Sequence, residues 1–528
     1  MPAIARTSAL SAKDPQPVLD DINEQFQLGP DTLVELTEAF LHEFKLGLGQ
    51  YNEPMAMIPT FVTGVPDGSE TGTFLALDLG GTNLQVRVCE VTLHGDTTFT
   101  LRQQKYKVSD ALKTGEASTL FDYLADSVDA FLTSHPPSDH DQQHNYGFGF
   151  AEPTPDVVHL GLTFSFPVEQ TALDSGKILT WTKGFSAKHA IGNDVVKLLQ
   201  DAFDRKHMHV KCVALVNDTV GALLSRAYTA GGCILGAIFG TGTNGAYVEE
   251  VANIKKLANE PAASNGGLMV VNTEWGAFNN TRSHLPSTPY DNVLDRTSIN
   301  PRFQAFEKMI SGMYLGEITR HVLLSLVDAS PKSLLFNGKA TSSMNAQWGF
   351  DTSVMSGVAE AWEGKDSSPQ SRENPVPKLS DYEKPESLDP TIKARLERVQ
   401  AVLVKELGYK NGEVSLRDAA VHRPMGMLCG SKTSSFIERV AVATVMIQTG
   451  RAVLPGQDGK PTKVGEPKIG VGVDGSLIQF YPHFEVILRE SLRTLVGKDV
   501  ESRVEIGLAK DGSGVGAALC ALQAIKQL

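Results

Sequence analysis

The chain has 528 residues, which suggests two to four domains at about 150 residues each. Apolar residues make up 41% and charged residues 21%, as in ordinary globular proteins. The formal net charge of −13 argues against a general nucleic-acid binder and against attachment to an anionic membrane surface. Five scattered cysteines without CxxC spacing argue against a zinc site and a disulfide framework. With no apolar run of about 18 residues, we expect a cytoplasmic protein without a membrane span.

Hydrophobic spacing predicts a helix first and strands afterwards. Apolar residues at steps of three or four predict helical structure within residues 15–50, namely Leu33, Leu36, Phe40, Phe44 and Leu48. From residue 72, short apolar runs that end in Gly, Asn or Asp predict strands: TFLALDLGG, VRVCEVTLHGD, HLGLTFSFP, VKCVALVND, ILGAIFGTG, LMVVNTEWG and KIGVGVDG. Amphipathic stretches at 117–133, 186–204 and 303–327 predict helices between them. This alternation indicates an α/β protein with more than one sheet.

Two segments of the chain resemble each other. Residues 75–83 (LALDLGGTN) and 236–244 (GAIFGTGTN) both combine an apolar strand, a glycine turn and a closing Thr-Asn. A third strand and turn, VGVDGS at 471–476, has a similar outline. Backbone N–H groups of such turns could converge on one polyphosphate from separate lobes, although a single glycine turn more often only reverses the chain.

Two polar segments predict exposed loops. Residues 134–159 contain four histidines, but their spacing fits no common metal site, so we interpret this segment as a solvated loop. Residues 363–390 are rich in Ser, Pro, Glu and Lys and predict a loop or a short linker.

A few polar residues suit phosphoryl transfer, which needs a base for the acceptor hydroxyl and cations for the developing charge. Asp218 ends an apolar run and is a candidate base, although an Asp there can also serve a turn or cap a helix. Thr182 and Lys183 offer a hydroxyl and an ammonium beside aromatic residues, but a lone lysine is usually solvated. Glu274 suits a polar group aimed into a pocket, and a structural hydrogen bond is an equal alternative.

The same motifs resemble the successive signatures of the eukaryotic hexokinase family, and specifically its single-unit fungal hexokinases and glucokinases. They are LALDLGGTN, LGLTFSFPVEQ, WTKGF, VALVNDTVG, IFGTGTNGAYVEE, NTEWGAF, FEKMISGMYLGE, VGVDGSL and KDGSGVGAAL, in unbroken order over about residues 55–527. The resemblance implies two ribonuclease-H-like lobes of the hexokinase–actin type around a central cleft. It implies a small lobe at 65–218 completed by the C-terminal helix 509–528, a large lobe at 219–508, and a tail and helix at 1–64 that pack on the large lobe.

The resemblance also implies roles for individual residues. Asp218, assisted by Lys183, would be the catalytic base that takes a proton from the 6-hydroxyl of a hexose. The residues implied to bind the sugar are Ser165, Thr182, Lys183, Asn217 and Asp218 from the small lobe and Asn244, Glu274 and Glu307 from the large lobe. The residues implied to bind ATP are Asp78, Gly80, Gly81, Thr82, Asn83, Arg87, Lys105, Thr241, Gly242, Gly475, Ser476, Gly512 and Ser513. No protein ligand set for a metal is implied; Mg²⁺ would arrive with ATP and contact Asp78 through water.

The resemblance implies an ATP-dependent hexose 6-kinase that acts on glucose, and also on fructose and mannose, as the first step of glycolysis. The alternative is a catalytically weakened hexokinase-like glucose sensor with a regulatory role. The implied ligands are a hexose and MgATP, without nucleic acid, and the oligomeric state, monomer or homodimer, stays open.

Two stretches depart from the family pattern. Relatives read GGTN-[FL]-R-V, whereas this chain carries Gln85 and Val86 before Arg87. Two extra residues preserve strand parity but would place Arg87 about 6–7 Å further from the turn at about 3.3 Å per residue. In residues 421–438, Pro424, Gly426 and Gly430 oppose the continuous helix expected there, the proline by about 3 kcal/mol.

Overall fold

Two sheets with the same strand order form the framework of the protein. The computed structural model describes residues 16–80, 85–135, 157–181, 185–258, 260–261, 266–363, 387–427, 435–463, 465–466, 468–482 and 484–527. Within these residues, the first sheet has the order β4-β3-β2-β5-β8. Its strands are β2 (Thr71–Gly80), β3 (Gln85–His94), β4 (Phe99–Lys107), β5 (Val158–Phe164) and β8 (Val210–Val216). β3 is antiparallel to both its neighbours, and β2, β5 and β8 are parallel.

The second sheet repeats this arrangement with one added strand, in the order β1-β11-β10-β9-β12-β13. Its strands are β1 (Ile58–Pro59), β9 (Cys233–Phe239), β10 (Thr243–Glu250), β11 (Leu268–Asn272), β12 (Ile469–Asp474) and β13 (Val504–Leu508). β10 is antiparallel to β9 and β11, while β12 is parallel to β9 and β13. The two similar sequence segments therefore occupy equivalent places, because β2 and β9 are the central strands that lead into the glycine turns. A small hairpin of β6 (Val168–Ala172) and β7 (Ser175–Ile178) forms a separate two-stranded sheet, in which β7 contacts β8.

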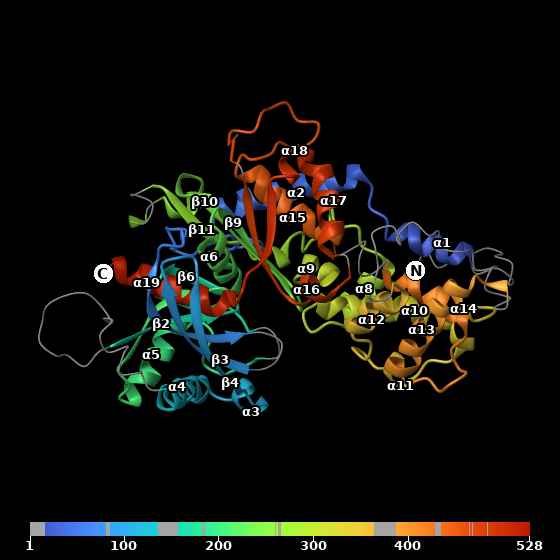
Figure 1. Cartoon of the computed structure of the whole chain (residues 1–528), viewed down its shortest axis with the longest axis horizontal. Coiled ribbons are helices and arrows are strands. Elements are labelled where there is room, and N and C mark those ends of the chain that lie inside the picture. The colour runs from blue at the N-terminus through green and yellow to red at the C-terminus, as the bar shows by residue number, and fades with distance from the viewer. Residues whose placement is uncertain are drawn as a thin grey trace, which may run out of the picture.

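Two helices each follow a strand of one sheet in the chain but pack on the other sheet. Helix α6 (Asp218–Ala230) follows β8 of the first sheet but packs on β9, β10 and β12 of the second. Helix α19 (Gly512–Gln527) follows β13 of the second sheet and packs on β2, β5 and β8 of the first. The two helices cross so closely that a Cβ at Gly516 would lie 2.2 Å from Gly221 Cα. Together they fill the space between the sheets (Figure 1).

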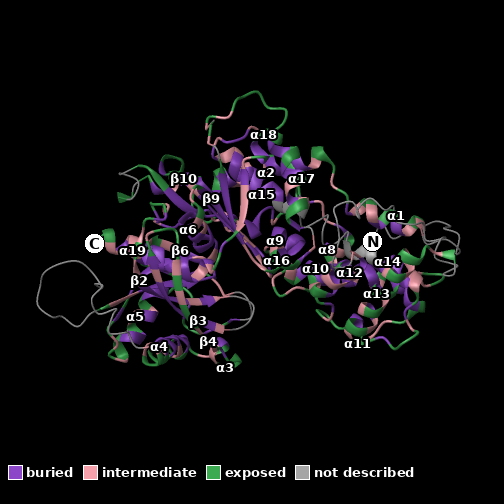
Figure 2. Ribbon diagram, viewed as in Figure 1, coloured by how far each residue is buried: buried purple, intermediate pink, exposed green. Residues whose placement is uncertain are grey.

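Other helices cover the outer faces of the two sheets. The first sheet is covered by α4 (Ala117–Ser134) and α5 (Val195–Arg205), with the short α3 (Asp110–Thr114) beside α4. The second sheet shares a core with α2 (Pro30–Gly49), α15 (Ser435–Gln448) and α17 (Phe484–Val496), near the short helices α16 (Ser476–Phe480) and α18 (Lys498–Glu501). Short 3₁₀ turns lie at Val251–Asn253, Lys255–Leu257, Trp275–Ala277 and Phe336–Gly338. Purple, buried residues accordingly line both sheets in Figure 2.

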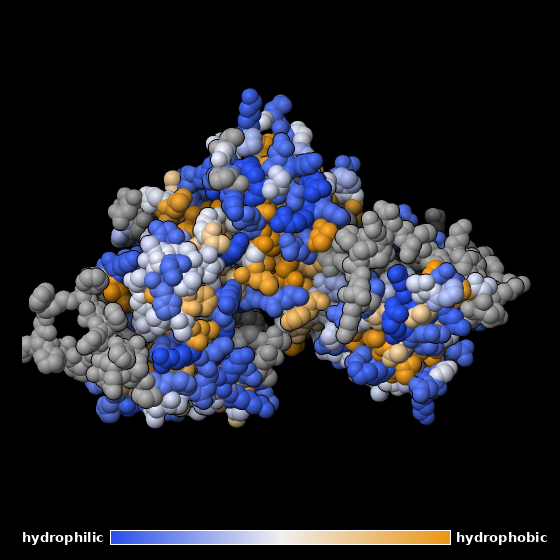
Figure 3. All heavy atoms as spheres, in the orientation of Figure 1, coloured by the Kyte–Doolittle hydropathy of each residue, from blue (hydrophilic) through white to orange (hydrophobic). Residues whose placement is uncertain are grey.

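A helical part extends from the second sheet, at the right of Figure 1. Its helices are α1 (Gln16–Gln25), α8 (Pro289–Thr297), α9 (Ala305–Ile310), α10 (Gly312–Val327), α11 (Ser342–Asn345), α12 (Thr352–Glu363), α13 (Pro390–Leu407) and α14 (Leu416–Met427). The space-filling view shows a notch between this part and the lobe built on the first sheet (Figure 3). In the part of the chain that the structure describes, no helix is both long and apolar enough to cross a membrane.

Three expectations from the sequence need correction or lie outside the description. The helix expected at 186–204 begins only at Val195, because Asp194 caps it with its side chain after a turn at Gly192. The helix expected at 303–327 is interrupted at Ser311 between α9 and α10. The predicted loops at 134–159 and 363–390 fall largely on 136–156 and 364–386, which are not among the described residues.

Helix α14 contradicts part of the expectation for residues 421–438. Its backbone stays helical through Pro424 and Gly426 and ends at Met427. The helix packs against α10, α12 and α13, and this tertiary packing outweighs the unfavourable propensity of the proline. Gly430 lies in 428–434, outside the described residues.

His422 in α14 gives the protein a pH-dependent stability. Its ring is fully buried, stacks on Phe350, and has no hydrogen-bond partner on either nitrogen among the described residues. Burial lowers the pKa of His422 from 6.5 to about 4. The unfolded chain therefore takes up a proton between these values while the folded chain does not, so stability falls as the pH drops from 6.5 to 4. At about 1.4 kcal/mol per pKa unit, the loss amounts to up to about 3 kcal/mol.

We expect His422→Leu to remove this part of the pH dependence. Urea unfolding at about pH 7 and about pH 5 measures it, with replacement of the exposed His42 as the control. An equal loss of stability on acidification in wild type and His422→Leu would contradict the expectation.

Candidate active site

The glycine turns of the second sheet pack directly on each other. Gly240, Thr241 and Gly242 connect β9 to β10, and Gly475 with Ser476 follows the adjacent strand β12. A Cβ at Gly240 would lie 3.1 Å from Gly475 Cα. Gly475 itself has φ +115°, and a Cβ there would lie 2.4 Å from the Phe239 carbonyl oxygen. Both turns therefore need glycine, and their backbones meet at one edge of the sheet.

The equivalent edge of the first sheet carries Asp78, Gly80 and Ser165. A Cβ at Gly80 would lie 2.7 Å from Ser165 Oγ, so this glycine lets the end of β2 approach the end of β5. Ser165 is buried and its backbone N–H donates to the Leu79 carbonyl oxygen at 3.3 Å. Gly81, Thr82 and Asn83, which the sequence also assigns to this turn, lie in 81–84, outside the described residues.

Arg87 lies next to Asp78 in spite of the two additional residues. β2 and β3 pair with Asp78 opposite Arg87 and Gly80 opposite Gln85. Arg87 Nη2 donates to Asp78 Oδ2 at 3.2 Å, and Nη1 reaches Asp511 Oδ1 at 3.4 Å. Val86 and Val88, on either side of Arg87, are both buried, so their side chains lie on the opposite face of β3. That the insertion preserves the parity of the family stays a prediction. In this register Arg87 stays beside Asp78.

Three carboxylates interact around the start of α6. Burial raises the pKa of Asp78, and the nearby Asp218 raises it further, while Arg87 and a hydrogen bond from Ser513 oppose the shift. Burial also raises the pKa of Asp474 in the same way, with a further contribution from Asp218. Arg87 offsets part of this local excess of negative charge.

Asn217, and not Asp218, caps helix α6 with its side chain. Asn217 is the N-cap of α6, and its side-chain oxygen accepts a hydrogen bond from the Thr219 N–H at 3.0 Å. Asp218 is the first helical residue and is half-buried. Among the described residues, none forms a hydrogen bond or an ion pair with its carboxylate. A carboxylate that does not serve as the cap suits a base that receives a proton from a ligand.

A network of amides and carboxylates lines the second lobe. Asn244 Nδ2 donates to Asn272 Oδ1 at 2.8 Å and to Glu274 Oε1 at 3.2 Å, and Asn272 Nδ2 donates to the same glutamate oxygen at 2.8 Å. Glu307 Oε2 accepts from the Thr243 backbone N–H at 3.1 Å. Residues 243–244 thus connect the two glutamates, and oriented polar groups of this kind suit a ring of sugar hydroxyls.

The remaining predicted residues fall around the same edges. Lys105 is exposed on β4 and lies opposite Arg87 in the strand register. Asp78, Arg87 and Lys105 therefore form one row across three neighbouring strands. Gly512 and Ser513 begin α19, and the hydrogen bond from Ser513 brings this helix to Asp78. Thr182 and Lys183 are outside the described residues, whereas Trp181 and Phe185 on either side stack at 5.6 Å.

Sequence reasoning missed Asn272, Asp474 and Asp511 as members of the site. Asn272 ends β11 two residues before Glu274, so its place beside a candidate residue in the chain was the available signal. Asp474 closes β12 directly before the glycine turn. Only the folding of α19 onto the first sheet brings Asp511 to Arg87, so no local pattern could have revealed it.

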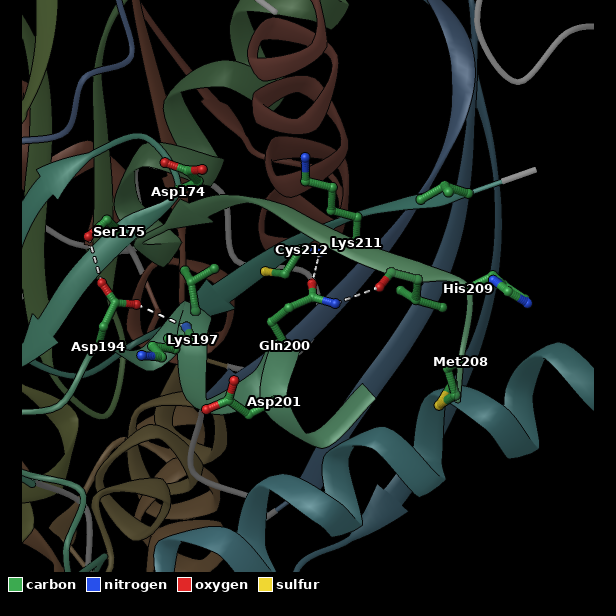
Figure 4. A pocket seen from close by; sticks show the side chains of 13 residues that line it. Asp174, Ser175, Asp194, Lys197, Gln200, Asp201, Met208, His209, Lys211 and Cys212 are labelled. Atoms are coloured by element: carbon green, nitrogen blue, oxygen red, sulfur yellow. Dashed lines mark hydrogen bonds between the residues drawn. The ribbon is translucent and has the colours of Figure 1, made fainter. Parts of the chain in front are cut away.

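A separate pocket lies beside the outer strand of the first sheet, away from these residues. Figure 4 shows Gln200 of α5 bridging the backbone of β8: its Nε2 donates to the Val210 carbonyl at 3.1 Å, and its Oε1 accepts from the Cys212 N–H at 3.0 Å. Asp194 likewise accepts from Ser175 Oγ at 2.6 Å and from the Lys197 N–H at 3.0 Å. These side chains are engaged with each other and with the strand edge, and none of the predicted site residues lines the pocket.

Gly242 offers a local test of the network. A Cβ there would lie 2.6 Å from Glu307 Oε2, the oxygen that accepts from Thr243. If Glu307 binds a sugar, as the family resemblance implies, Gly242→Ala should displace this carboxylate and raise the KM for the sugar about tenfold, because misplacing a binding group by about 1 Å is costly. Steady-state kinetics measures the effect. Gly357→Ala in α12, where the nearest contact is 3.5 Å, is the matched control. A normal sugar KM in Gly242→Ala would contradict the expectation.

Two ribonuclease-H-like lobes, with glycine turns and carboxylates at their facing edges, define a two-lobed phosphotransferase. Comparison with known proteins identifies its kind. Family models described as hexokinase match residues 18–228 and 234–523. The chain belongs to the hexokinase family. It is an enzyme that transfers a phosphoryl group from ATP to a sugar.

Individual relatives agree over nearly the whole length of the chain. It is 40% identical to the glucokinase of Aspergillus niger over 508 residues, which cover 92% of this chain and 93% of that protein. It is 36% identical to glucokinase-1 of Saccharomyces cerevisiae, with 96% and 97% covered. A solved hexokinase from Schistosoma mansoni in complex with glucose is similar with a TM-score of 0.77 at 29% identity, covering 97% of this chain and all (100%) of the other. The predicted family and fold class are confirmed.

Proposed function

We propose that this protein phosphorylates glucose, and also fructose and mannose, at the 6-hydroxyl, and that it does so in the cytoplasm as the first step of glycolysis. The proposal rests on one observation, namely that a network suited to a polyhydroxyl ligand and a carboxylate suited to a base occur in the same protein. An amide–glutamate network on the large lobe suits a polyhydroxyl ligand, and a carboxylate without a protein partner among the described residues lies at the start of α6. The similarity to a hexokinase solved with glucose supports the choice of sugar.

In the proposed mechanism, Asp218 is the general base. Its carboxylate takes the proton of the 6-hydroxyl as that oxygen bonds to the γ-phosphorus, and the bond from the γ-phosphorus to the bridging oxygen of ADP breaks. Asn244, Glu274 and Glu307 hold the sugar from the large lobe. Asn217, Ser165, Thr182 and Lys183 contact it from the small lobe, and Lys183 also assists the base.

ATP binds at the facing glycine turns in this proposal. The backbone at 80–83 and at 241–242 holds the phosphates, Arg87 and Lys105 supply positive charge, and the turns at 475–476 and 512–513 lie on the adenosine side. Among the described residues, no group of three or more His, Cys, Asp or Glu side chains could hold a metal by itself. The half-buried carboxylate of Asp78 fits the Mg²⁺ that accompanies ATP, through water, and Mg²⁺ neutralises charge on the phosphates.

We further infer that residues 65–218 with 509–528 form the small lobe, that 219–508 form the large lobe, and that 1–64 pack on the large lobe. The packing of α19 on the first sheet and of α2 against α15 supports this division. Closing of the lobes around the sugar would exclude water from the transfer step.

A coupled assay with MgATP and glucose, fructose or mannose tests the function. We expect the protein to phosphorylate glucose. We also expect the rate to saturate with increasing concentration of each hexose that it phosphorylates. Glucose binding without turnover on any hexose would refute the proposed reaction. ATP hydrolysis at the same rate without sugar, the control, would also refute it.

A further inference from the structure

Helix α2 supports two segments of the site from outside it. Phe40 of α2 stacks on Phe278 with ring centroids 4.0 Å apart and meets the edge of Phe306 at 5.2 Å. Phe278 and Phe306 contact each other at 5.7 Å, which closes a triangle of fully buried rings. Phe278 follows Glu274 by four residues, and Phe306 directly precedes Glu307. The two glutamates of the network therefore stand on segments that share one support.

Glu43, one helical turn after Phe40, adds a polar contact to this support. Both of its carboxylate oxygens accept from the backbone N–H of Asn279, at 3.1 and 3.3 Å. Asn279 has a left-handed backbone, with φ 50°, and is only 3% exposed. Its side-chain oxygen accepts from the N–H groups of His284 and Leu285. Glu43 thus fixes the residue around which the loop after Phe278 turns.

The next residue carries this contact to α9. The side-chain oxygen of Asn280 accepts from the Ala305 N–H at 3.0 Å, and Ala305 is the first residue of the helix that holds Glu307. Gln304, the N-cap of α9, has a left-handed backbone and no side-chain cap bond. The Asn280 side chain therefore caps α9 from another segment. Because Asn280 directly follows Asn279 in the chain, fixing Asn279 also fixes Asn280.

Burial of the Glu43 carboxylate is energetically unfavourable. Burial raises the pKa of Glu43 to about 7, against the opposing backbone hydrogen bond from Asn279, and Glu53 adds to the increase. The hydrogen bonds described for Glu43 are those from Asn279. They hold the loop after Phe278 in place, and this stabilisation offsets the free-energy cost of burying the carboxylate.

We propose that Glu43 is a positioning residue for the sugar site, which holds Asn279 and, through Asn280, the start of α9, so that Glu274 and Glu307 keep the relation that a hexose needs. The inference rests on the proposed sugar-binding role of these two glutamates. It makes α2 of the N-terminal segment part of substrate recognition, although no residue of α2 touches the sugar in this proposal.

The test compares Glu43→Ala and Glu43→Gln with the wild-type protein. Alanine removes both acceptors, and glutamine keeps one oxygen and the volume. We expect Glu43→Ala to raise the glucose Kd, measured by titration calorimetry, and the glucose KM about tenfold. We expect the ATP KM and the kcat at saturating glucose to stay within about twofold, and Glu43→Gln to restore most of the glucose affinity. Glu35→Ala, on the exposed face of the same helix, is the matched control and should change none of these values.

Each outcome decides between the alternatives. An unchanged glucose Kd in both Glu43 variants would overturn the inference. Equal increases in the glucose and ATP KM, or a Glu35→Ala effect of the same size, would also overturn it, since these indicate a general structural role. If Glu43→Ala does not fold, Asn280→Ala takes its place, because it removes the oxygen that accepts from the Ala305 N–H. We expect it to raise the glucose Kd, and an unchanged Kd there would overturn the inference. Absence of hexose phosphorylation by the wild-type protein would instead refute the proposed function.

Discussion

The Asp218→Ala variant is expected to lose about 10³-fold in kcat on glucose, because the attacking hydroxyl then has no base in the transition state. Glucose binding should persist in part, since the amide–glutamate network around Asn244 and Glu274 is untouched. Steady-state kinetics gives kcat, and titration calorimetry gives the glucose Kd. The contrast between the two measurements distinguishes a base from a residue that only binds sugar.

The control for this variant is Asp201→Ala, an exposed carboxylate of the small lobe in α5. We expect it to retain normal turnover. Near-wild-type kcat in Asp218→Ala would eliminate Asp218 as the base. Removal of Asp218 also takes one negative charge from the vicinity of Asp78 and Asp474, so a KM for ATP that falls while kcat collapses is compatible with the assignment.

The second large effect is expected for Arg87→Ala, which should lower kcat/KM for ATP about 10²-fold and leave the glucose Kd within about twofold. Without Arg87, the described carboxylates of Asp78, Asp218 and Asp474 would face the phosphates with less compensation. Arg87→Lys should recover only part of the loss, because one ammonium cannot reproduce the fork that reaches both Asp78 and Asp511.

Arg102→Ala is the matched control for Arg87→Ala. Arg102 lies on the neighbouring strand β4, pairs with Glu90 at 3.4 Å and is 43% exposed. An ion pair at such exposure contributes little, so nucleotide kinetics should remain normal. A normal kcat/KM for ATP in Arg87→Ala would show that the additional residues Gln85 and Val86 have removed Arg87 from catalysis.

The strands could be predicted from the sequence because each apolar run ends at a Gly, Asn or Asp that stops it. The run TFLALDLGG became β2 (Thr71–Gly80), and KIGVGVDG became β12 (Ile469–Asp474). Strand pairing was harder to predict. Only the observed register shows that Gly80 lies opposite Gln85 and that Arg87 lies beside Asp78.

Helix boundaries and the partners of site residues depended on tertiary contacts. Pro424 lies inside α14 because neighbouring helices support that helix, a condition that no local propensity contains. The family resemblance supplied Glu274 and Glu307 as candidates. It could not supply Glu43, which reaches the site only through the fold of Asn279 and lies 236 residues before it in the chain. The roles assigned to the site residues, including Thr182 and Lys183, stay predictions.

The exchange of α6 and α19 between the sheets affects the order in which the protein can mature during synthesis. The strands of the first sheet leave the ribosome early, but the core beneath them is completed by Val515, Leu519 and Cys520 of α19. The lobe that is encoded first is therefore finished last and stays open along one face until translation is nearly complete. A premature stop before residue 512 would expose Phe74, Val91 and Val213, so a short truncation at one end of the chain would make the opposite end a substrate for chaperones and proteases.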